Sequence, residues 1–340
     1  MSGPPFPAAL PPDLFAINAA LIAVRQAAEF LCDRATLLVL LHAHGGACRY
    51  AEFGERTGLA NRLVSSRLTR LTDDGLLVRI PYSRRPLRHA YHLTHMGVAL
   101  FDVLALLATW EQVWQEGVQG VSAVRVEHLG CAAAAAAAAP SSAMHLHCAA
   151  CNGVINAQDI SLYVRQKEMA QMPSKSTAMR RTRQDLGPQA NGASKGPLPQ
   201  ALSVLGDKWS IEVLVCAFFG LRQFGDFGMR LGISSNILTD RLSRLVAEGL
   251  LRRSDANEPL HNERKGLYLL TDKGRDFYGI LIAIQVWADQ WIDHRVRSPV
   301  KLRHSPCQKL LQPVLTCMTC GQTVTYAQGR ILLSPVAPTT

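Results

Sequence analysis

The sequence contains one segment twice, and this duplication constrains the fold more than any other feature. Residues 33–79 align with residues 207–253 at a constant offset of 174 positions, and 17 of the 47 aligned pairs are identical. After a three-residue change of offset the match resumes, so that Trp110 aligns with Trp287. A repeat of this length predicts two copies of one domain rather than a solenoid of short units.

Composition excludes several classes of protein. Of the 340 residues, 48% are hydrophobic, which is enough to form cores, and the net charge of +10 favours a polyanionic partner. Nine cysteines in a chain of this length do not form the disulfide framework of a small secreted protein. The longest apolar stretches, around 98–109 and 211–221, are short and contain Asp102 and Glu212, and no signal peptide is evident. We expect a cytoplasmic protein without a membrane partner.

Two helices are predicted at the start of the second copy, where the pattern is cleaner. A first apolar helix (210–221) follows Asp207 and Ser210, either of which can cap it. A short helix (224–231) comes next, and both of its phenylalanines are expected to face inward. Gly232 then interrupts the helical pattern, as glycine does at helix ends.

A third helix completes a helix-turn-helix. Ser234 or Ser235 caps it, and it is predicted to reach Glu248, where Gly249 ends it. It carries one buried stripe at i, i+4 and i+7, formed by Leu238, Leu242 and Leu245. Two helices joined by a tight turn that contains glycine are typical of a helix-turn-helix.

A β-hairpin and a last helix extend this motif. Two strands, Leu250–Arg253 and Gly266–Leu270, surround a polar, basic loop and predict a wing. Thr271 caps a helix that runs through Trp287 and Trp291. The predicted fold class is therefore mainly α with small β wings: two winged helix-turn-helix domains, each followed by a small zinc-ribbon-like β module.

The second copy resembles the HxlR-type winged-helix transcriptional regulators over about 90 residues with the spacing kept. The motifs that carry the resemblance are Gly206-Asp207-Lys208-Trp209-Ser210, Phe224-Gly225-Asp226-Phe227, Gly232-Ile233-Ser234, Leu238-Thr239-Asp240-Arg241-Leu242, Glu248-Gly249-Leu250-Leu251 and Tyr268-x-Leu270-Thr271-x-x-Gly274. The first copy departs from the family pattern at Ala35, the tryptophan position, but matches it at Tyr91-His92-Leu93-Thr94. The resemblance implies a regulator that dimerises through its terminal helices. A fused pair then implies a single-chain pseudo-dimer, although two such chains could also associate.

The outer face of each third helix is the candidate surface for reading bases. A helix-turn-helix places the start of its second helix in the major groove of double-stranded DNA. In the second copy the outward positions are Ser235, Asn236, Thr239, Asp240 and Ser243. The matching positions in the first copy are Asn61, Arg62, Ser65, Ser66 and Thr69. Asn236 can make a bidentate contact with adenine, and Arg62 can grip a guanine. Because the two helices differ, the two operator half-sites are predicted to differ.

Basic side chains beside these helices are candidates for phosphate contacts. Those on the helices are Arg67, Arg70, Arg241 and Arg244, and those on the wings are Arg84, Arg85, Arg88, Arg264 and Lys265. For any one of them, a solvated surface charge or an intramolecular ion pair is the alternative. Neutralising roughly 6–10 phosphates predicts a strong dependence of the affinity on salt.

Six of the nine cysteines recur in a second repeated pattern. In the second copy a His-x2-Cys pair is followed, after a gap of nine residues, by a Cys-x2-Cys pair: His304, Cys307, Cys317 and Cys320. In the first copy the gap is sixteen residues: His128, Cys131, Cys148 and Cys151. Cys-x2-Cys is the spacing of a metal knuckle, so one structural Zn²⁺ site with three cysteines and one histidine is predicted in each copy.

Some alternatives to these zinc sites remain open. His145 and His147 compete with His128 for the fourth position of the first site. The cysteine pairs could also be a redox-active dithiol, or cysteines that are merely buried. Of the cysteines outside the pattern, Cys32, Cys48 and Cys216, the best candidate for a thiol sensor is Cys32.

The domain map follows from the repeats and from a linker between them. From Ser161 to Gln200 seven basic residues stand against two acidic ones, in a stretch rich in Ser, Gly, Pro and Gln. The predicted segments are a disordered N-terminus (1–15), a first winged helix (16–118), a first zinc module with a polyalanine loop (119–156), a basic linker (157–200), a second winged helix (201–296) and a second zinc module (297–334).

Function follows from the fold and not from a catalytic site. The sequence has no Ser–His–Asp pattern, Walker loop or Gly-x-Gly-x-x-Gly after a strand, so no enzyme is expected. The leading prediction is a sequence-specific DNA-binding transcriptional regulator. The alternatives are a thiol- or metal-responsive sensor and an architectural or protein-interaction module without DNA sequence preference.

Overall fold

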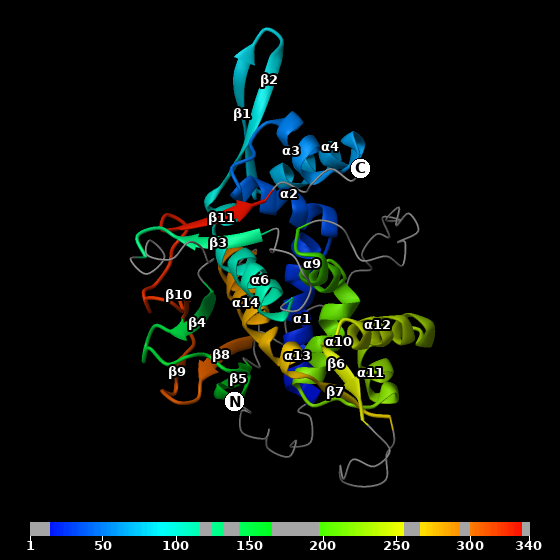
Figure 1. Ribbon diagram of the computed structural model, residues 1–340. Helices are drawn as coiled ribbons and strands as arrows, with labels where there is room; N and C mark the ends of the chain where they lie inside the picture. The colour runs from blue at the N-terminus through cyan, green and yellow to red at the C-terminus, as the bar shows by residue number, and fades with distance from the viewer. Residues whose placement is uncertain are drawn as a thin grey trace.

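Both copies fold into the same winged-helix arrangement, beside which the remaining strands form a β module (Figure 1). The computed structural model describes residues 14–115, 124–131, 143–164, 197–254, 266–292 and 300–334. Within them the chain is mostly helical with small antiparallel sheets, which confirms the predicted fold class. The polyalanine run (132–139) lies outside the described residues, as do residues 1–13 of the N-terminus.

The first winged helix consists of a helical half, a long hairpin and two further helices. Its elements are α1 (Leu14–Leu31), α2 (Arg34–His44), α3 (Tyr50–Thr57), α4 (Asn61–Asp73), β1 (Leu77–Arg84), β2 (Leu87–Leu93), α5 (His95–Val98) and α6 (Phe101–Trp114). The antiparallel strands β1 and β2 form the wing, which projects from the rest of the molecule at the top of Figure 1.

The second winged helix repeats this order, with a shorter first helix and shorter wing strands. They are α9 (Pro199–Leu205), α10 (Lys208–Phe218), α11 (Phe224–Leu231), α12 (Ser235–Ala247), β6 (Leu251–Arg253), β7 (Tyr268–Leu270), α13 (Asp272–Asp276) and α14 (Tyr278–Trp291). Its wing is the antiparallel pair β6–β7, and the loop that joins these strands (255–265) lies outside the described residues.

The three helices predicted at the start of the second copy are confirmed to within a few residues. The Asp207 side chain caps α10 by accepting from the Ser210 N–H, and Ser234 is the N-cap residue of α12. Of the two phenylalanines of α11, Phe227 is buried as expected, but Phe224 is 38% exposed. Phe224 is the first residue of α11, and its counterpart Tyr50 at the start of α3 is also exposed, so this position lies at the rim of the core.

The last predicted helix is two helices, α13 and α14, separated by a single residue. At Phe277 the hydrogen bond runs to the carbonyl three residues back, on Gly274, which interrupts the α-helical ladder. Thr271 caps α13 through the Gly274 N–H, as predicted. A Cβ atom on Gly274 would lie 2.1 Å from the Leu250 carbonyl oxygen, so only glycine allows α13 to approach the wing this closely.

Helix α1 was not among the predicted elements, yet it is the longest described helix, with 18 residues. Its buried side chains recur at helical spacing, at Ile17, Leu21, Val24, Ala28 and Leu31, so periodicity alone could have found it. It packs against α10 and α14 of the other copy. Helix α1 therefore belongs to the contact between the two copies.

Six strands of the β module form three pairs, each of which joins the two copies. In the first copy they are β3 (Val124–His128), β4 (Met144–Cys148) and β5 (Ile160–Val164); in the second they are β8 (Val300–His304), β10 (Pro313–Cys317) and β11 (Gly329–Leu333), with the short β9 (Lys309–Leu310) beside β8. The antiparallel pairs are β3–β11, β4–β10 and β5–β8.

These pairs correct the predicted domain map. The two zinc modules expected at 119–156 and 297–334 are interleaved rather than separate, because the pairs β3–β11, β4–β10 and β5–β8 each join a strand of one copy to a strand of the other. The linker expected at 157–200 is also shorter. Residues 157–164 form a 3-10 turn and strand β5, and α9 begins at Pro199. Residues 165–196 lie outside the described part of the chain.

One stretch of the described chain, His95–Trp114, is long and apolar enough to cross a membrane by length and composition alone. Of its most apolar window, 67% is buried inside the protein, as in a core helix. The buried residues of both winged helices and of the β module form one continuous hydrophobic cluster. The two copies and the β module therefore share a single core.

Candidate DNA-binding surface and metal sites

The two candidate recognition helices, α4 and α12, bury one face and expose the other. The predicted stripe of α12 is fully buried at Leu238, Leu242 and Leu245, and α4 buries the equivalent side chains of Val64, Leu68 and Leu71. All ten residues predicted to read bases are exposed: Asn61, Arg62, Ser65, Ser66, Thr69, Ser235, Asn236, Thr239, Asp240 and Ser243. The structure thus leaves both outer faces free to contact DNA.

The arrangement of these helices is shown in Figure 1, where α4 and α12 both lie on the right-hand side of the molecule. The wings point to opposite ends, β1–β2 upward and β6–β7 downward, and the β module occupies the left-hand side. In this view both recognition helices therefore lie away from the β module.

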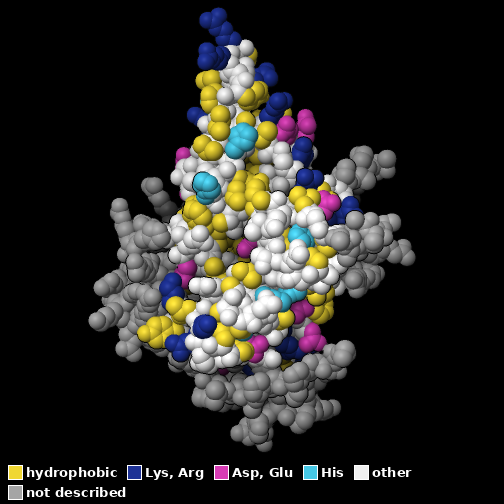
Figure 2. Space-filling model, turned by 90° about the vertical axis from the view of Figure 1, so that its left-hand side faces the viewer, with side chains coloured by type: hydrophobic (Ala, Val, Ile, Leu, Met, Phe, Trp, Pro, Cys, Tyr) yellow, Lys and Arg dark blue, Asp and Glu magenta, His cyan; other side chains and the backbone are white. Residues whose placement is uncertain are grey.

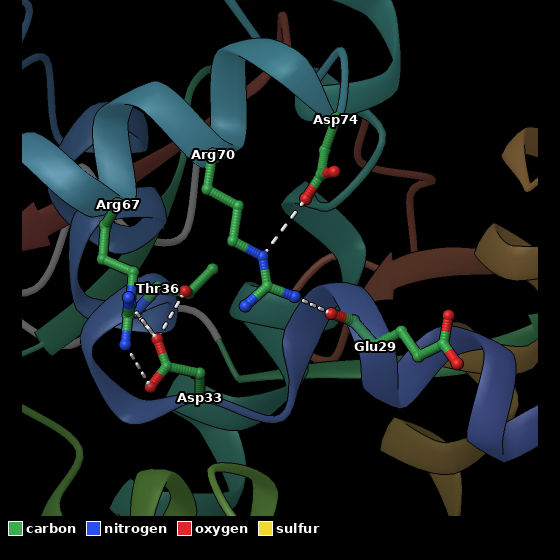
Figure 3. A network of polar contacts seen from close by, with 6 residues as sticks. All are labelled: Glu29, Asp33, Thr36, Arg67, Arg70 and Asp74. Carbon is green, nitrogen blue, oxygen red and sulfur yellow. Dashed lines mark hydrogen bonds and ion pairs between the residues drawn. The ribbon is translucent and has the colours of Figure 1, made fainter. Parts of the chain in front are cut away.

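Two of the predicted phosphate contacts, Arg67 and Arg241, are engaged inside the protein. Arg67 Nε lies 2.5 Å from an oxygen of Asp33, whose carboxylate also caps α2 by accepting from the N–H and the hydroxyl of Thr36 (Figure 3). Burial alone would raise the pKa of Asp33, but the bonds from Arg67 and Thr36 outweigh it and lower this pKa. Arg67 thus ties the recognition helix α4 to the start of α2.

The second copy repeats this contact, since Arg241 Nε lies 2.7 Å from an oxygen of Asp207, the cap of α10. Arg70 points the same way as Arg67 in Figure 3; it donates to the Glu29 carbonyl oxygen and forms an ion pair of 3.4 Å with Asp74. Contact of these arginines with DNA remains a prediction, and the structure already gives each of the three a partner within the protein.

The wing arginines of the first copy are free of such contacts in the described residues. Arg84, Arg85 and Arg88 are exposed around the turn between β1 and β2. In Figure 2 basic side chains gather at the tip of this wing, at the top of the molecule. The second-wing candidates Arg264 and Lys265 lie outside the described residues.

Reciprocal tryptophan contacts join the two copies, whereas the sequence had indicated only helix packing for these rings. The Trp110 indole donates to the Lys273 carbonyl at 3.0 Å, and the Trp287 indole donates to the Met96 carbonyl at 3.0 Å. Trp110 aligns with Trp287, and Met96 aligns with Lys273, at the same offset. Each copy therefore makes the same contact to the other.

All eight predicted metal ligands lie in two clusters, but the clusters combine the two copies. We call the cluster of His128, Cys131, Cys317 and Cys320 site A, and the cluster of Cys148, Cys151, His304 and Cys307 site B. The expectation of one site within each copy is therefore wrong, although the residues are the predicted ones. The physical reason is the strand pairing, which brings each His-x2-Cys pair to the Cys-x2-Cys pair of the other copy.

The geometry of both sites fits a tetrahedral metal ion. In site B the His304 Nδ1 atom lies 3.3 Å from the Cys151 sulfur and 3.4 Å from the Cys307 sulfur, and the Cys148 and Cys307 sulfurs are 3.9 Å apart. In site A the His128 Nδ1 atom lies 3.3 Å from the Cys320 sulfur. Zinc–sulfur bonds of about 2.3 Å and zinc–nitrogen bonds of about 2.0 Å require similar separations. Three thiols and one imidazole also form a donor set that suits zinc.

Backbone amides prepare two of the thiols for metal binding. The Lys309 N–H donates to the Cys307 sulfur, and this bond lowers the pKa of the Cys307 thiol to about 7. Burial opposes ionisation of Cys317, but the N–H groups of Cys320 and Thr319 prevail and lower its pKa to about 6. The thiolate is the form that binds a metal ion, so these amides favour the ligand state.

The competing histidines of the first copy are not in either cluster. His145 and His147 lie on one face of β4, with their Nε2 atoms 2.6 Å apart, and His147 also contacts Asn152 at 3.4 Å. They bond to each other rather than to the cysteines. His128 therefore occupies the fourth position that the sequence left open.

The cysteines outside the clusters are poor thiol sensors. Burial raises the pKa of Cys32, and nearby Asp207 and Glu212 raise it further. Burial also raises the pKa of Cys216 to about 12, and the pKa of Cys48 is raised. Because reactive cysteines need a low pKa, these three do not favour a sensor built on them.

Comparison with known proteins decides the family. The model of the HxlR-like helix-turn-helix family matches residues 30–119 and 204–296, which covers both winged helices. The chain belongs to the HxlR-like helix-turn-helix family. It contains that domain twice, as the duplication in the sequence predicted. The family comprises transcriptional regulators with a DNA-binding helix-turn-helix.

Relatives of this HxlR-like chain carry the same description. It is 35% identical over 142 residues to the uncharacterized HTH-type transcriptional regulator Rv3095 of Mycobacterium tuberculosis, a match that covers 42% of the chain and 85% of the relative. It is 32% identical over 96 residues to the uncharacterized HTH-type transcriptional regulator YvaP of Bacillus subtilis, covering 28% and 85%. The solved structure of the candidate transcription factor PA1374 from Pseudomonas aeruginosa is 32% identical and covers 38% of the chain and 86% of that protein, with a TM-score of 0.30.

Proposed function

We propose that this HxlR-like protein is a sequence-specific DNA-binding transcriptional regulator that occupies its operator as a single-chain pseudo-dimer. In this proposal α4 reads one half-site and α12 reads the other. Residues at the start of each helix contact base edges, and the exposed arginines of the first wing contact phosphates. A cytoplasmic location follows from access to chromosomal DNA.

The reciprocal pair of tryptophan contacts carries the proposal. Trp110 and Trp287 each donate to the same backbone position of the opposite copy, at the same distance. Such isologous contacts are typical of a two-fold dimer interface. They support a pseudo-dimer within one chain, with both recognition helices on the same side of the molecule (Figure 1).

The half-sites are expected to differ because the two helices present different side chains. Arg62 in α4 takes the place that Asn236 has in α12, and Ser66 takes that of Asp240. Arginine pairs best with guanine and asparagine with adenine, so the two halves favour different bases.

Zinc is the proposed ion for sites A and B, and its role is structural. Each site offers four protein ligands and leaves no position for a substrate water. When bound, the ion would neutralise the thiolates and hold the knuckles to the His-x2-Cys segments. Nothing in this role requires chemistry at the metal.

Selection of bound sites from a random DNA pool at about 0.15 M salt tests the proposal. The expected result is one enriched sequence with two unlike half-sites, and the variant R62A/N236A serves as the matched control that loses the enrichment. A palindromic site would contradict the assignment of one half-site to each helix. An unenriched pool would favour an architectural or protein-interaction role instead.

A further inference from the structure

We infer that the two metal ions link the two copies, an arrangement that we call the clasp, and that binding of one ion strengthens binding of the other. This inference rests on the zinc part of the proposed function, not on the DNA part. It concerns how sites A and B depend on each other and on both copies.

Neither copy can complete a site alone. Site A takes His128 and Cys131 from the first copy and Cys317 and Cys320 from the second; site B takes the opposite halves. Two ligands seldom hold a structural zinc ion, which is almost always four-coordinate. Every bound ion therefore joins the two copies.

One strand pair connects the two sites. In the β4–β10 ribbon, Cys148 stands opposite Pro313 at one end and Cys317 stands opposite Met144 at the other. Cys148 is a ligand of site B and Cys317 is a ligand of site A. Because each strand of the ribbon is short, any shift of β4 along β10 displaces ligands of both sites.

The outer strand pairs position the histidine of each site. His128 ends β3 opposite Gly329 of β11, and His304 ends β8 opposite Ile160 of β5. Both histidines are therefore positioned by strands that the other copy supplies. The same register recurs on both sides, so the module has approximate two-fold symmetry like that of the tryptophan contacts.

The shared β4–β10 ribbon explains why the second ion binds more easily than the first. Each site brings three sulfurs and one imidazole together, with the Cys148 and Cys307 sulfurs of site B 3.9 Å apart, so a bound ion holds ligands of both copies in place. The first ion must order the shared ribbon as well as its own ligands, so part of its binding free energy is spent on that ordering. The second ion then meets a ribbon already in place and binds more tightly.

The β module also packs against the first winged helix. Tyr326 lies between Cys320 and β11. Its ring packs edge-on against Phe101 of α6, with ring centroids 5.8 Å apart, and against His44 of α2 at 5.6 Å. A Cβ atom on Gly329 would lie 2.2 Å from Phe101, so β11 fits this surface only with glycine there. The segment of the second copy that follows Cys317 and Cys320 of site A thus packs against the helices of the first copy.

Native mass spectrometry of the full chain during a zinc titration tests the coupling without any substitution. Apo protein is prepared under reducing conditions and receives one equivalent of Zn²⁺. Independent, equal sites would leave about half of the molecules with a single ion, whereas a typical coupling of about 5- to 150-fold depletes that species in favour of zero and two ions. A dominant singly loaded species would overturn the inference.

Three matched quadruple variants test the pairing. H128N/C131S/C148S/C151S removes every ligand of the first copy and is expected to bind no zinc tightly, because each site keeps two ligands. H128N/C131S/C317S/C320S clears only site A and is expected to keep one ion at site B, with lower affinity than the wild type. The mirror variant C148S/C151S/H304N/C307S clears only site B, and circular dichroism reports whether each variant folds.

The outcomes separate this inference from the proposed function. If the first variant keeps one ion and the second keeps none, each copy has its own site and the clasp is refuted while structural zinc stands. If reduced wild-type protein holds no zinc, the zinc proposal fails and the clasp fails with it. Selection of DNA sites is judged separately from both results.

Discussion

At the scale of single residues, the aspartate that begins each second helix does more than cap it. Asp33 accepts from Thr36 and binds Arg67, 34 positions along the chain, and Asp207 does the same with Ser210 and Arg241. The sequence predicted Asp207 as a cap because capping is local. The arginine partner could not be predicted, since nothing in the spacing shows that α4 crosses the start of α2, or that α12 crosses the start of α10.

Replacing Asp33 separates the cap from the ion pair. Asparagine caps as well as aspartate does, but D33N removes the charge and one of the two oxygens that accept from Arg67. It should therefore lower the free energy of unfolding by about 1–3 kcal/mol, whereas D33A, which also removes the cap, should cost about 1–2 kcal/mol more. Since folding lowers the pKa of Asp33, the charge stabilises above the unfolded pKa of about 3.9 and this stabilisation is lost as the pH falls further.

Urea unfolding at pH 7 and at about pH 3 measures both effects. The difference between wild type and D33N is expected at pH 7 and should shrink in acid. D33N unfolding like wild type at pH 7 would show that the Arg67 contact contributes no stability.

At the scale of elements, the recognition helices were the most predictable part of the fold. The boundaries of α11 and the buried leucines of α12 follow from glycine breaks and helical periodicity, which are local signals. Phe224 was misjudged because its exposure depends on where the core ends. The length of the first wing likewise depends on pairing between β1 and β2, which the sequence pattern indicated only loosely.

A substitution in one recognition helix should weaken DNA binding through only one of the two half-sites. R62A is expected to weaken binding by about 1–3 kcal/mol through the half-site read by α4, and N236A by a similar amount through the other half-site. Fluorescence anisotropy with operators mutated in one half measures this. The affinity of each variant should not change when the half-site that it no longer reads is mutated. If mutation of either half-site lowers the affinity of a variant equally, the assignment is contradicted.

The first wing should contribute to salt dependence rather than to sequence preference. The triple variant R84A/R85A/R88A is expected to reduce the slope of log affinity against log salt by about 0.9 for each phosphate that the wing no longer neutralises, without changing the preferred sequence. Arg330 is an exposed arginine on β11, in the β module, and R330A is the matched control. An unchanged slope in the triple variant would exclude the wing from the interface.

At the scale of the whole molecule, the interleaved β module is what sequence reasoning missed. The eight ligands were predicted because Cys-x2-Cys and His-x2-Cys are recognisable wherever they occur. Their division between sites A and B was not, because a site within one copy and a site across two copies have the same spacing in the sequence. Only the strand pairing, β3 with β11 and β5 with β8, decides between them.

Removing the metal should loosen the whole molecule, since the β module shares one hydrophobic core with both winged helices. Treatment with a strong chelator under reducing conditions is expected to lower the Tm by about 10 °C or more, because structural zinc contributes several kcal/mol to folding. Differential scanning calorimetry measures the shift. In a variant in which all eight ligands are replaced, the chelator should not change the Tm. An equal shift in that variant would mean that the chelator acts elsewhere.

The crossed strands also determine when the protein can finish folding during its synthesis. The ribosome releases β3, β4 and β5 first, and each has its hydrogen-bonding partner in a strand that has not yet been translated. Unpaired strand edges readily join other chains. From the appearance of β3 until β11 emerges, the nascent chain therefore carries open edges, and crowded polysomes are where mispairing between neighbouring copies should begin.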